Sequence, residues 1–252
     1  MKIRFRSTLA GVVFVLGAAA PLLAQSSGDG FMFHAPEGRF TIRAGYDHAN
    51  AHSDIFNDAV NFFTLRRADF SGVTIGGEAG FSLGSRFDVS ADLAFSHKSK
   101  GSEYRNLIDN NNQPIEQNTT FDRIPLTANV RFYLVEPGRS IGNYAWIPNK
   151  IVPWVGAGGG VMWYRFHQTG DFVDYKTNNV FNTGANDPYN ASESAGMYQA
   201  MAGADISLSP HVALRLDSRY VWANAALPSQ FKGYNNIDLS GVQGTLGLTY
   251  RL

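Results

Sequence analysis

Eight stretches of the chain alternate apolar and polar residues with a period of two. They lie near residues 39–46, 72–83, 86–96, 124–133, 152–164, 198–208, 212–222 and 242–252. Successive side chains of a strand point to opposite faces, so each stretch predicts a β-strand with one apolar and one polar face. The last stretch is the most informative, because Val242, Leu246 and Leu248 share a face and the pattern continues to Leu252. We expect no amphipathic helix of useful length in this chain.

The lengths of the strands and of their links predict a topology. Each strand has about nine to twelve residues, the length that a tilted strand needs to cross a bilayer. Long links near 47–70, 97–122, 165–194 and 223–237 alternate with tight turns at 84–85 and 209–211. This predicts an all-β fold, namely an eight-stranded antiparallel up-and-down transmembrane β-barrel with long extracellular loops and both termini in the periplasm. The link at 136–150 is long for a periplasmic turn, and its role stays open.

The N-terminus has the order of a secretory signal peptide. The basic residues Lys2, Arg4 and Arg6 precede an apolar run at 9–16 and small residues up to Ala24. The run is shorter than the roughly 20 apolar residues of a spanning helix, which disfavours a signal anchor. We therefore expect a signal peptide at 1–24 and a barrel domain at 25–252.

Composition adds little beyond excluding some classes of partner. The chain has 21 basic and 21 acidic residues, and removing 1–24 leaves 18 basic against 21 acidic, about −3. No basic stripe is present, so we expect no nucleic-acid partner. The absence of cysteine fits an exported protein without disulfides but is weak evidence on its own.

A soluble barrel of the lipocalin type is the structural alternative, with apolar side chains inside and charges outside. Aromatic residues at both ends of the apolar faces favour a membrane barrel in contact with outer-membrane lipid. The expected periplasmic girdle comprises Phe40, Phe81, Phe87, Phe132 and Tyr250. The expected outer girdle comprises Tyr46, Phe95, Trp163, Tyr198, Tyr220 and Trp222.

Three segments resemble the small outer-membrane β-barrel families that include OmpA-type and OmpW-type transmembrane domains. They are residues 152–160 (VPWVGAGGG), 208–215 (LSPHVALR) and 248–252 (LTYRL). The last resembles the family's assembly signal at Leu248, Tyr250 and Leu252, although Leu252 stands where Phe is usual. The resemblance implies a partner during biogenesis, the barrel-assembly machinery. We expect no peptidoglycan-binding domain, because the chain ends with the eighth strand.

The polar faces of the strands predict a charged lumen in which the two signs nearly balance. Its expected members are Arg43, Glu78, Arg86, Asp88, Asp92, Arg131, Asp205, Arg215, Asp217, Arg219 and Arg251. An ion-selective pore would concentrate one sign of charge. A balanced set in a narrow barrel instead favours salt bridges that fill the lumen.

The first long link carries six large apolar residues that need an explanation. They are Ile55, Phe56, Val60, Phe62, Phe63 and Leu65. The first interpretation is a lid over the barrel mouth, and the second is an entry site for a small apolar ligand.

Other candidate sites are weaker, and we expect neither a metal nor a cofactor. His48 and His52 have metal-ligand spacing only on a helix, which the link does not predict. Ser96 and His97, with Glu103 nearby, are adjacent in a strand and so point to opposite faces.

The chain is therefore expected to be a non-enzymatic barrel with a surface or envelope-integrity role, or with loop-mediated binding, and with a largely plugged lumen. The alternative is a narrow conduit or entry site for small apolar or amphipathic solutes. A lipid-modifying enzyme is the third hypothesis. The ligand or surface partner stays unknown at this stage.

Overall fold

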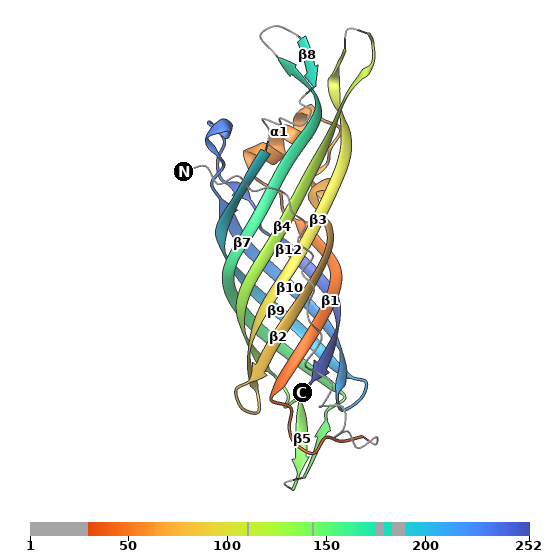
Figure 1. Ribbon diagram of the computed structural model, residues 1–252, viewed down its shortest axis with the longest axis vertical. Coiled ribbons are helices and arrows are strands. Elements are labelled where there is room, and N and C mark those ends of the chain that lie inside the picture. The colour runs from red at the N-terminus through yellow and green to blue at the C-terminus, as the bar shows by residue number, and fades with distance from the viewer. Residues whose placement is uncertain (1–29, 110, 143, 175–178, 183–189) are drawn as a thin grey trace, which may run out of the picture.

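Eight long strands form a closed antiparallel barrel, as the alternation predicts (Figure 1). The computed structural model describes residues 30–252 except 110, 143, 175–178 and 183–189, so the expected signal peptide at 1–24 lies outside the described residues. The strands are β1 (Gly38–Ala49), β2 (Gly72–Ser82), β3 (Phe87–Ile108), β4 (Pro114–Tyr133), β7 (Ile151–Asp174), β9 (Asn190–Ser207), β10 (Val212–Ala225) and β12 (Gly241–Arg251). Each pairs with the next in this order, and β12 returns to β1 with Ile42 opposite Leu248. The predicted fold class is confirmed.

The apolar faces of these strands point outward. Ile42 and Leu248 are 64% and 56% exposed, whereas their polar neighbours Thr41 and Thr249 are buried. This arrangement is the reverse of a soluble barrel and excludes the lipocalin-type alternative. In the described part of the chain, no helix is both long enough and apolar enough to cross a membrane.

The two ends of the barrel differ. We call the end where β1 begins and β12 finishes the base, and the opposite end the mouth. Between β1 and β2, the chain forms α1 (Asp54–Phe62) and the 3-10 turn η2 (Arg67–Phe70) at the mouth. Between β10 and β12 lie η3 (Ser229–Phe231) and β11 (Ile237–Asp238). The expectation of no useful helix was wrong, because α1 is amphipathic and buries one face through Ile55, Phe56 and Ala59. Its nine residues are too short a segment for the sequence pattern to reveal.

Several strands continue well beyond the predicted lengths. β3 has 22 residues and β7 has 24, about twice what a bilayer crossing needs. Their outer parts form ribbons that project past the mouth, with β8 (Asn179–Asn182) paired to the end of β7 (Figure 1). The links predicted at 97–122 and 165–194 are therefore largely strand. Their outward faces are mostly polar, so strand pairing continues where the outward apolar alternation stops.

The link at 136–150 forms a small hairpin below the base, made of β5 (Gly138–Ile141) and β6 (Ala145–Pro148) (Figure 1). Met32 bridges to Trp146 through two backbone hydrogen bonds of 2.8 and 2.7 Å. Trp146 is buried, and the guanidinium of Arg251 lies 5.7 Å from its ring centroid. The hairpin thus helps to close the base, which explains a link too long for a simple turn.

Candidate functional site

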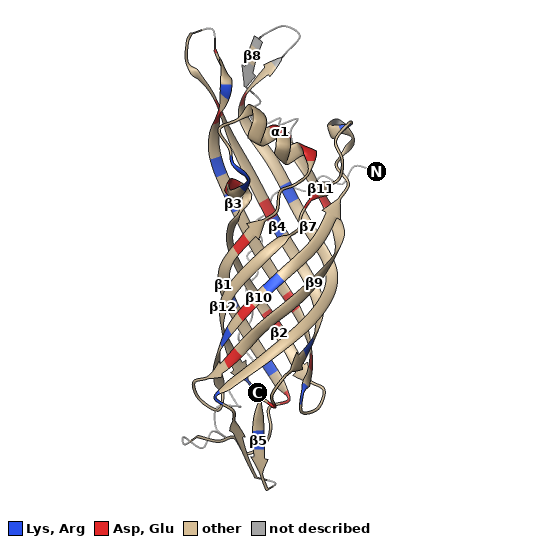
Figure 2. Cartoon of the chain, turned by 180° about the vertical axis from the view of Figure 1, so that it is seen from behind, with Lys and Arg blue, Asp and Glu red and all other residues tan. Residues whose placement is uncertain are grey.

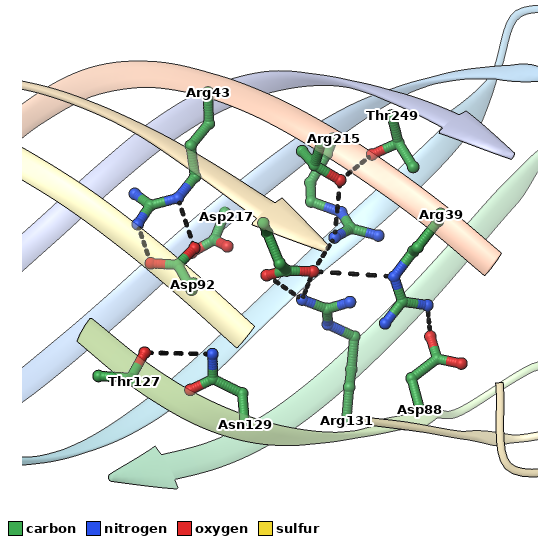
Figure 3. A network of polar contacts seen from close by, with 12 residues as sticks. Arg39, Arg43, Asp88, Asp92, Thr127, Asn129, Arg131, Arg215, Asp217 and Thr249 are labelled. Atoms are coloured by element: carbon green, nitrogen blue, oxygen red, sulfur yellow. Dashed lines mark hydrogen bonds and ion pairs between the residues drawn. The ribbon is translucent and has the colours of Figure 1, made fainter. Parts of the chain in front are cut away.

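The middle of the lumen is organised around one carboxylate, Glu78 on β2. Arg131 Nη2 lies 2.8 Å from both of its oxygens, and Arg215 Nη1 lies 3.0 Å from Oε1. Arg39 Nε and Arg219 Nη2 approach within 3.7 and 3.6 Å. These arginines come from β1, β4 and β10, so the carboxylate links opposite walls of the barrel (Figure 3).

Further paired carboxylates surround this hub. Arg215 binds Asp205 through two hydrogen bonds of 2.7 Å. Arg43 binds Asp92 at 3.1 and 2.7 Å (Figure 3). Arg219 binds Asp217 at 2.9 and 2.8 Å. Two-point pairing of this kind is the strongest geometry available to a guanidinium and a carboxylate.

Two contacts join these pairs into one network. Arg219 Nη1 lies 3.2 Å from Asp92 Oδ1, and Arg39 pairs with Asp88. Figure 2 shows both signs of charge interspersed along the barrel strands. Buried charges cost several kcal/mol each unless they are paired, so this network is stable only as a set.

Strand register and small residues explain why these long side chains fit. Asp88 lies opposite Arg131 across β3 and β4, and Arg215 lies opposite Asp205 across β10 and β9. The guanidinium of Arg131 lies 4.4 Å from the ring centroid of Trp154. That ring occupies space left by Gly203, because a Cβ there would come within 2.5 Å of the ring. Glycine on the inner face therefore makes room for the stacked arginine.

The lumen also contains three charged residues that sequence reasoning did not assign to it: Arg39, Asp47 and Arg123. Arg123 Nη2 lies 2.8 Å from Asp47 Oδ2, nearer to the mouth than the hub. Arg39 and Asp47 share the inward parity of Arg43 on β1, and Arg123 shares that of Arg131 on β4. The alternation could have found all three, but they lie at or beyond the ends of the predicted apolar runs.

Arg86 is a correction to the predicted lumen set. It lies in the turn between β2 and β3, where its side chain is 47% exposed and its Nε is 3.8 Å from Glu136. The inward face of β3 begins only at Asp88, so strand parity does not apply at residue 86. Arg251 does point inward, but it serves the base: Nη2 donates to Ser207 Oγ at 2.9 Å.

Below the network the lumen is nearly filled. A cavity lined by Arg39, Tyr133 and Arg251, among others, has a volume of about 30 Å³. A single water molecule needs about 10–15 Å³ of such space, so the cavity admits only about two water molecules. The Tyr133 side chain helps to fill this part of the lumen, where its hydroxyl accepts a hydrogen bond of 2.6 Å from Arg39.

The mouth is filled by apolar side chains from the first link. Phe56 of α1 is fully buried, with its ring centroid 4.7 Å from Phe70, 5.4 Å from Phe121 and 5.7 Å from Phe166. Ile55, Phe63 and Leu65 are also buried in this cluster, and Val60 packs against it. Phe62 points away and is 47% exposed. We call this cluster the mouth plug.

Polar contacts fasten the mouth plug to the barrel rim. Arg105 of β3 donates to the carbonyl oxygens of Val60 and Leu65, each at 3.1 Å. On the other side, Tyr234 donates to Asp58 Oδ2 at 2.8 Å. The link is therefore held at both flanks rather than resting on the mouth.

The remaining sequence candidates fall elsewhere. Ser96 is buried on the inner face, whereas His97 points outward and its Nδ1 bonds Asp122 Oδ1 at 2.6 Å. Ser96 and His97 are therefore not a nucleophile–base pair. His48 Nδ1 bonds Ser71 Oγ at 3.1 Å and does not share a metal site with His52. No group of three His, Cys, Asp or Glu suited to a metal occurs among the described residues.

Residues 10–251 match the family model described as "Outer membrane protein beta-barrel domain". Comparison with curated proteins gives no significant match. Among solved structures, Neisserial surface protein A is similar at 12% identity and a TM-score of 0.45, over 84% of this chain and 97% of that one. OprG of Pseudomonas aeruginosa is similar at 15% and 0.47, over 86% and 97%, and outer membrane protein W of E. coli at 15% and 0.38, over 88% and 100%.

Proposed function

Because the chain belongs to the outer membrane protein beta-barrel domain family, which implies the bacterial outer membrane, we propose that it is a closed surface anchor. In this proposal the barrel conducts nothing and catalyses nothing. It holds the ribbons and links at its mouth in place as a binding surface, or contributes to the integrity of the envelope. The mouth faces the outside of the cell and the termini face the periplasm.

The observation that carries the proposal is the presence of two plugs in series. The arginine–carboxylate network around Glu78 ties β1, β2, β4 and β10 together across the lumen. Above it, the mouth plug fills the space beneath α1 with buried aromatic and aliphatic side chains. A solute passing through would have to break buried ion pairs and displace a packed apolar cluster, and both steps are costly.

The ribbons support the binding part of the proposal. β3 and β4 pair from Lys98–Phe121 outward to Glu103–Glu116, beyond the apolar wall. At the far end of β3, Leu107 and Ile108 are 36% and 62% exposed. Exposed apolar residues at the end of a largely polar ribbon are suited to contact a partner.

The conduit alternative needs an open lumen, and the solute-entry alternative needs an open pocket under the first link. The residues predicted to line that entry, including Ile55, Phe56 and Leu65, are instead packed against one another and the wall. The packing therefore supports the lid interpretation over the entry site.

Single-channel recording in planar bilayers tests the proposal. We expect the purified protein to give silent traces across voltages. A variant with residues 54–65 replaced by a short Gly/Ser link and Glu78→Ala, Arg131→Ala should give discrete conductance steps, because both plugs are then weakened. Steps of similar size from the unmodified protein would overturn the closed-barrel proposal and favour the conduit.

A further inference from the structure

The outer wall of the barrel carries a charged cluster, which we call the clasp, made of His97, Asp122 and Arg165. The three residues lie side by side on β3, β4 and β7, with Asp122 opposite His97 on one side and Arg165 on the other. His97 Nδ1 lies 2.6 Å from Asp122 Oδ1. Arg165 Nε and Nη2 lie 3.0 and 2.6 Å from Asp122 Oδ2. One carboxylate therefore orients two side chains along the wall.

The clasp is half open to its surroundings. The Asp122 side chain is 6% exposed, whereas those of His97 and Arg165 are 52% and 58% exposed. Among the described residues, Arg165 Nη1 and His97 Nε2 have no protein partner. The two donors are thus held by a buried acceptor while their other nitrogens face outward.

The position of the clasp coincides with the edge of the apolar wall. On the base side, its nearest outward neighbours are Phe95, Ile124 and Trp163, which are exposed by 41%, 36% and 44%. On the mouth side, the next row pairs Thr120 with Ser99 and with His167. Aromatic residues mark the headgroup region of a membrane, so the clasp lies at headgroup depth with hydrocarbon-facing residues directly below.

A groove on the outer wall connects the clasp with the apolar residues on its base side. It has a volume of about 590 Å³ and is lined by Phe95, Ile124 and Trp163 together with the three clasp residues. The His97 ring stacks on Phe95, with centroids 6.2 Å apart and planes 12° apart. An occupant would thus meet aromatic and aliphatic surface at one end and the outward guanidinium N–H groups of Arg165 at the other.

We propose that the clasp and this groove bind a phosphorylated membrane lipid, with its phosphate at Arg165, beside the His97 ring, and an acyl chain along Phe95, Ile124 and Trp163. Guanidinium groups recognise phosphate through charge-assisted hydrogen bonds. Asp122 acts as a positioning residue, because it uses the inner edge of Arg165 and leaves the outer edge for the ligand. The proposal needs only a membrane barrel and does not depend on whether the lumen conducts.

The test uses the full barrel in neutral detergent micelles with three probes: dioctanoyl phosphatidic acid, dioctanoylglycerol and inorganic phosphate. NMR signals of the Arg165 and His97 side chains, assigned with the variants below, report binding. We expect phosphatidic acid to shift both signals, and the other two probes to bind at least about tenfold more weakly, because each lacks one half of the ligand.

Variants separate the clasp from general effects of charge. Arg165→Gln should weaken phosphatidic acid binding about tenfold or more, and Arg165→Lys should weaken it less, because charge remains but the planar fork is lost. Arg66→Gln is the matched control, since Arg66 lies in a mouth link with an 81% exposed side chain and should leave binding unchanged. A heat-modifiable mobility shift on gels confirms that each variant is folded.

Three results would overturn the proposal. Equal binding of dioctanoylglycerol would show a purely apolar groove, and equal binding of inorganic phosphate would show a site for free anions. Unchanged phosphatidic acid binding by folded Arg165→Gln would remove the clasp from the site. Silent bilayer traces would not affect any of these outcomes, so the proposal and the closed-barrel function fail independently.

Discussion

Glu78 matters more than any other lumen residue because its loss leaves several partners without compensation. Arg131 and Arg215 both bond its carboxylate and are both 1% exposed. Removing one member of a buried ion pair is far more damaging than never having had the pair, since the remaining charge stays desolvated. Breaking a solvent-exposed ion pair changes the free energy of unfolding far less, because water solvates the remaining charge.

We therefore expect Glu78→Gln to lower the free energy of unfolding by about 3–5 kcal/mol. Urea unfolding in lipid vesicles, followed by tryptophan fluorescence, measures the change. Glu136→Gln is the control, because the Arg86–Glu136 pair is about half exposed at 3.8 Å, and we expect a change below about 1 kcal/mol. Similar decreases in the free energy of unfolding of the two variants would show that the buried network does not stabilise the barrel.

Helix α1 closes the barrel mouth with its apolar face and is not an independent surface helix. One face carries Phe56 into the mouth plug, while Phe62 on the other face stays 47% exposed. Phe56→Ala should cost about 3–5 kcal/mol through the cavity it leaves, and Phe62→Ala less than about 1 kcal/mol. Hydrogen exchange of the amides in α1 should accelerate in the first variant only. Equal protection in both would mean that α1 is fastened by its polar contacts alone.

The elements also show how far the sequence pattern reaches. Period-two alternation predicts which residues face the lumen, and so it places Arg43, Glu78 and Arg131 inside. It does not give distances between strands, so the convergence of four arginines on Glu78 could not be predicted. It misassigns Arg86, which lies one residue before β3. Arg39 has the inward parity but was not assigned to the lumen, because it lies at the very start of β1. It also misses α1, because one buried face on nine residues is too short a signal among loop residues.

For the whole molecule, the proposed orientation can be tested directly, because the chain contains no cysteine. Gln113→Cys lies at the β3–β4 ribbon, and Ser140→Cys lies on the β5–β6 hairpin; both positions are exposed. We expect a membrane-impermeant maleimide to label Gln113→Cys on intact cells and Ser140→Cys only after the envelope is opened. Labelling in the opposite order would place the mouth in the periplasm.

The hub at Glu78 also has a consequence for how the protein is made. The bond from Arg215 to Glu78 spans 137 residues of chain, and β1 gains its second neighbour only when β12, the last strand of the barrel, pairs with it. Contacts so distant in sequence form late in folding, because the loop they close is long. Interactions that form after the transition state mainly slow unfolding. The ion pairs of the lumen network therefore form when the barrel closes. They should slow unfolding of the finished barrel more than they speed its folding.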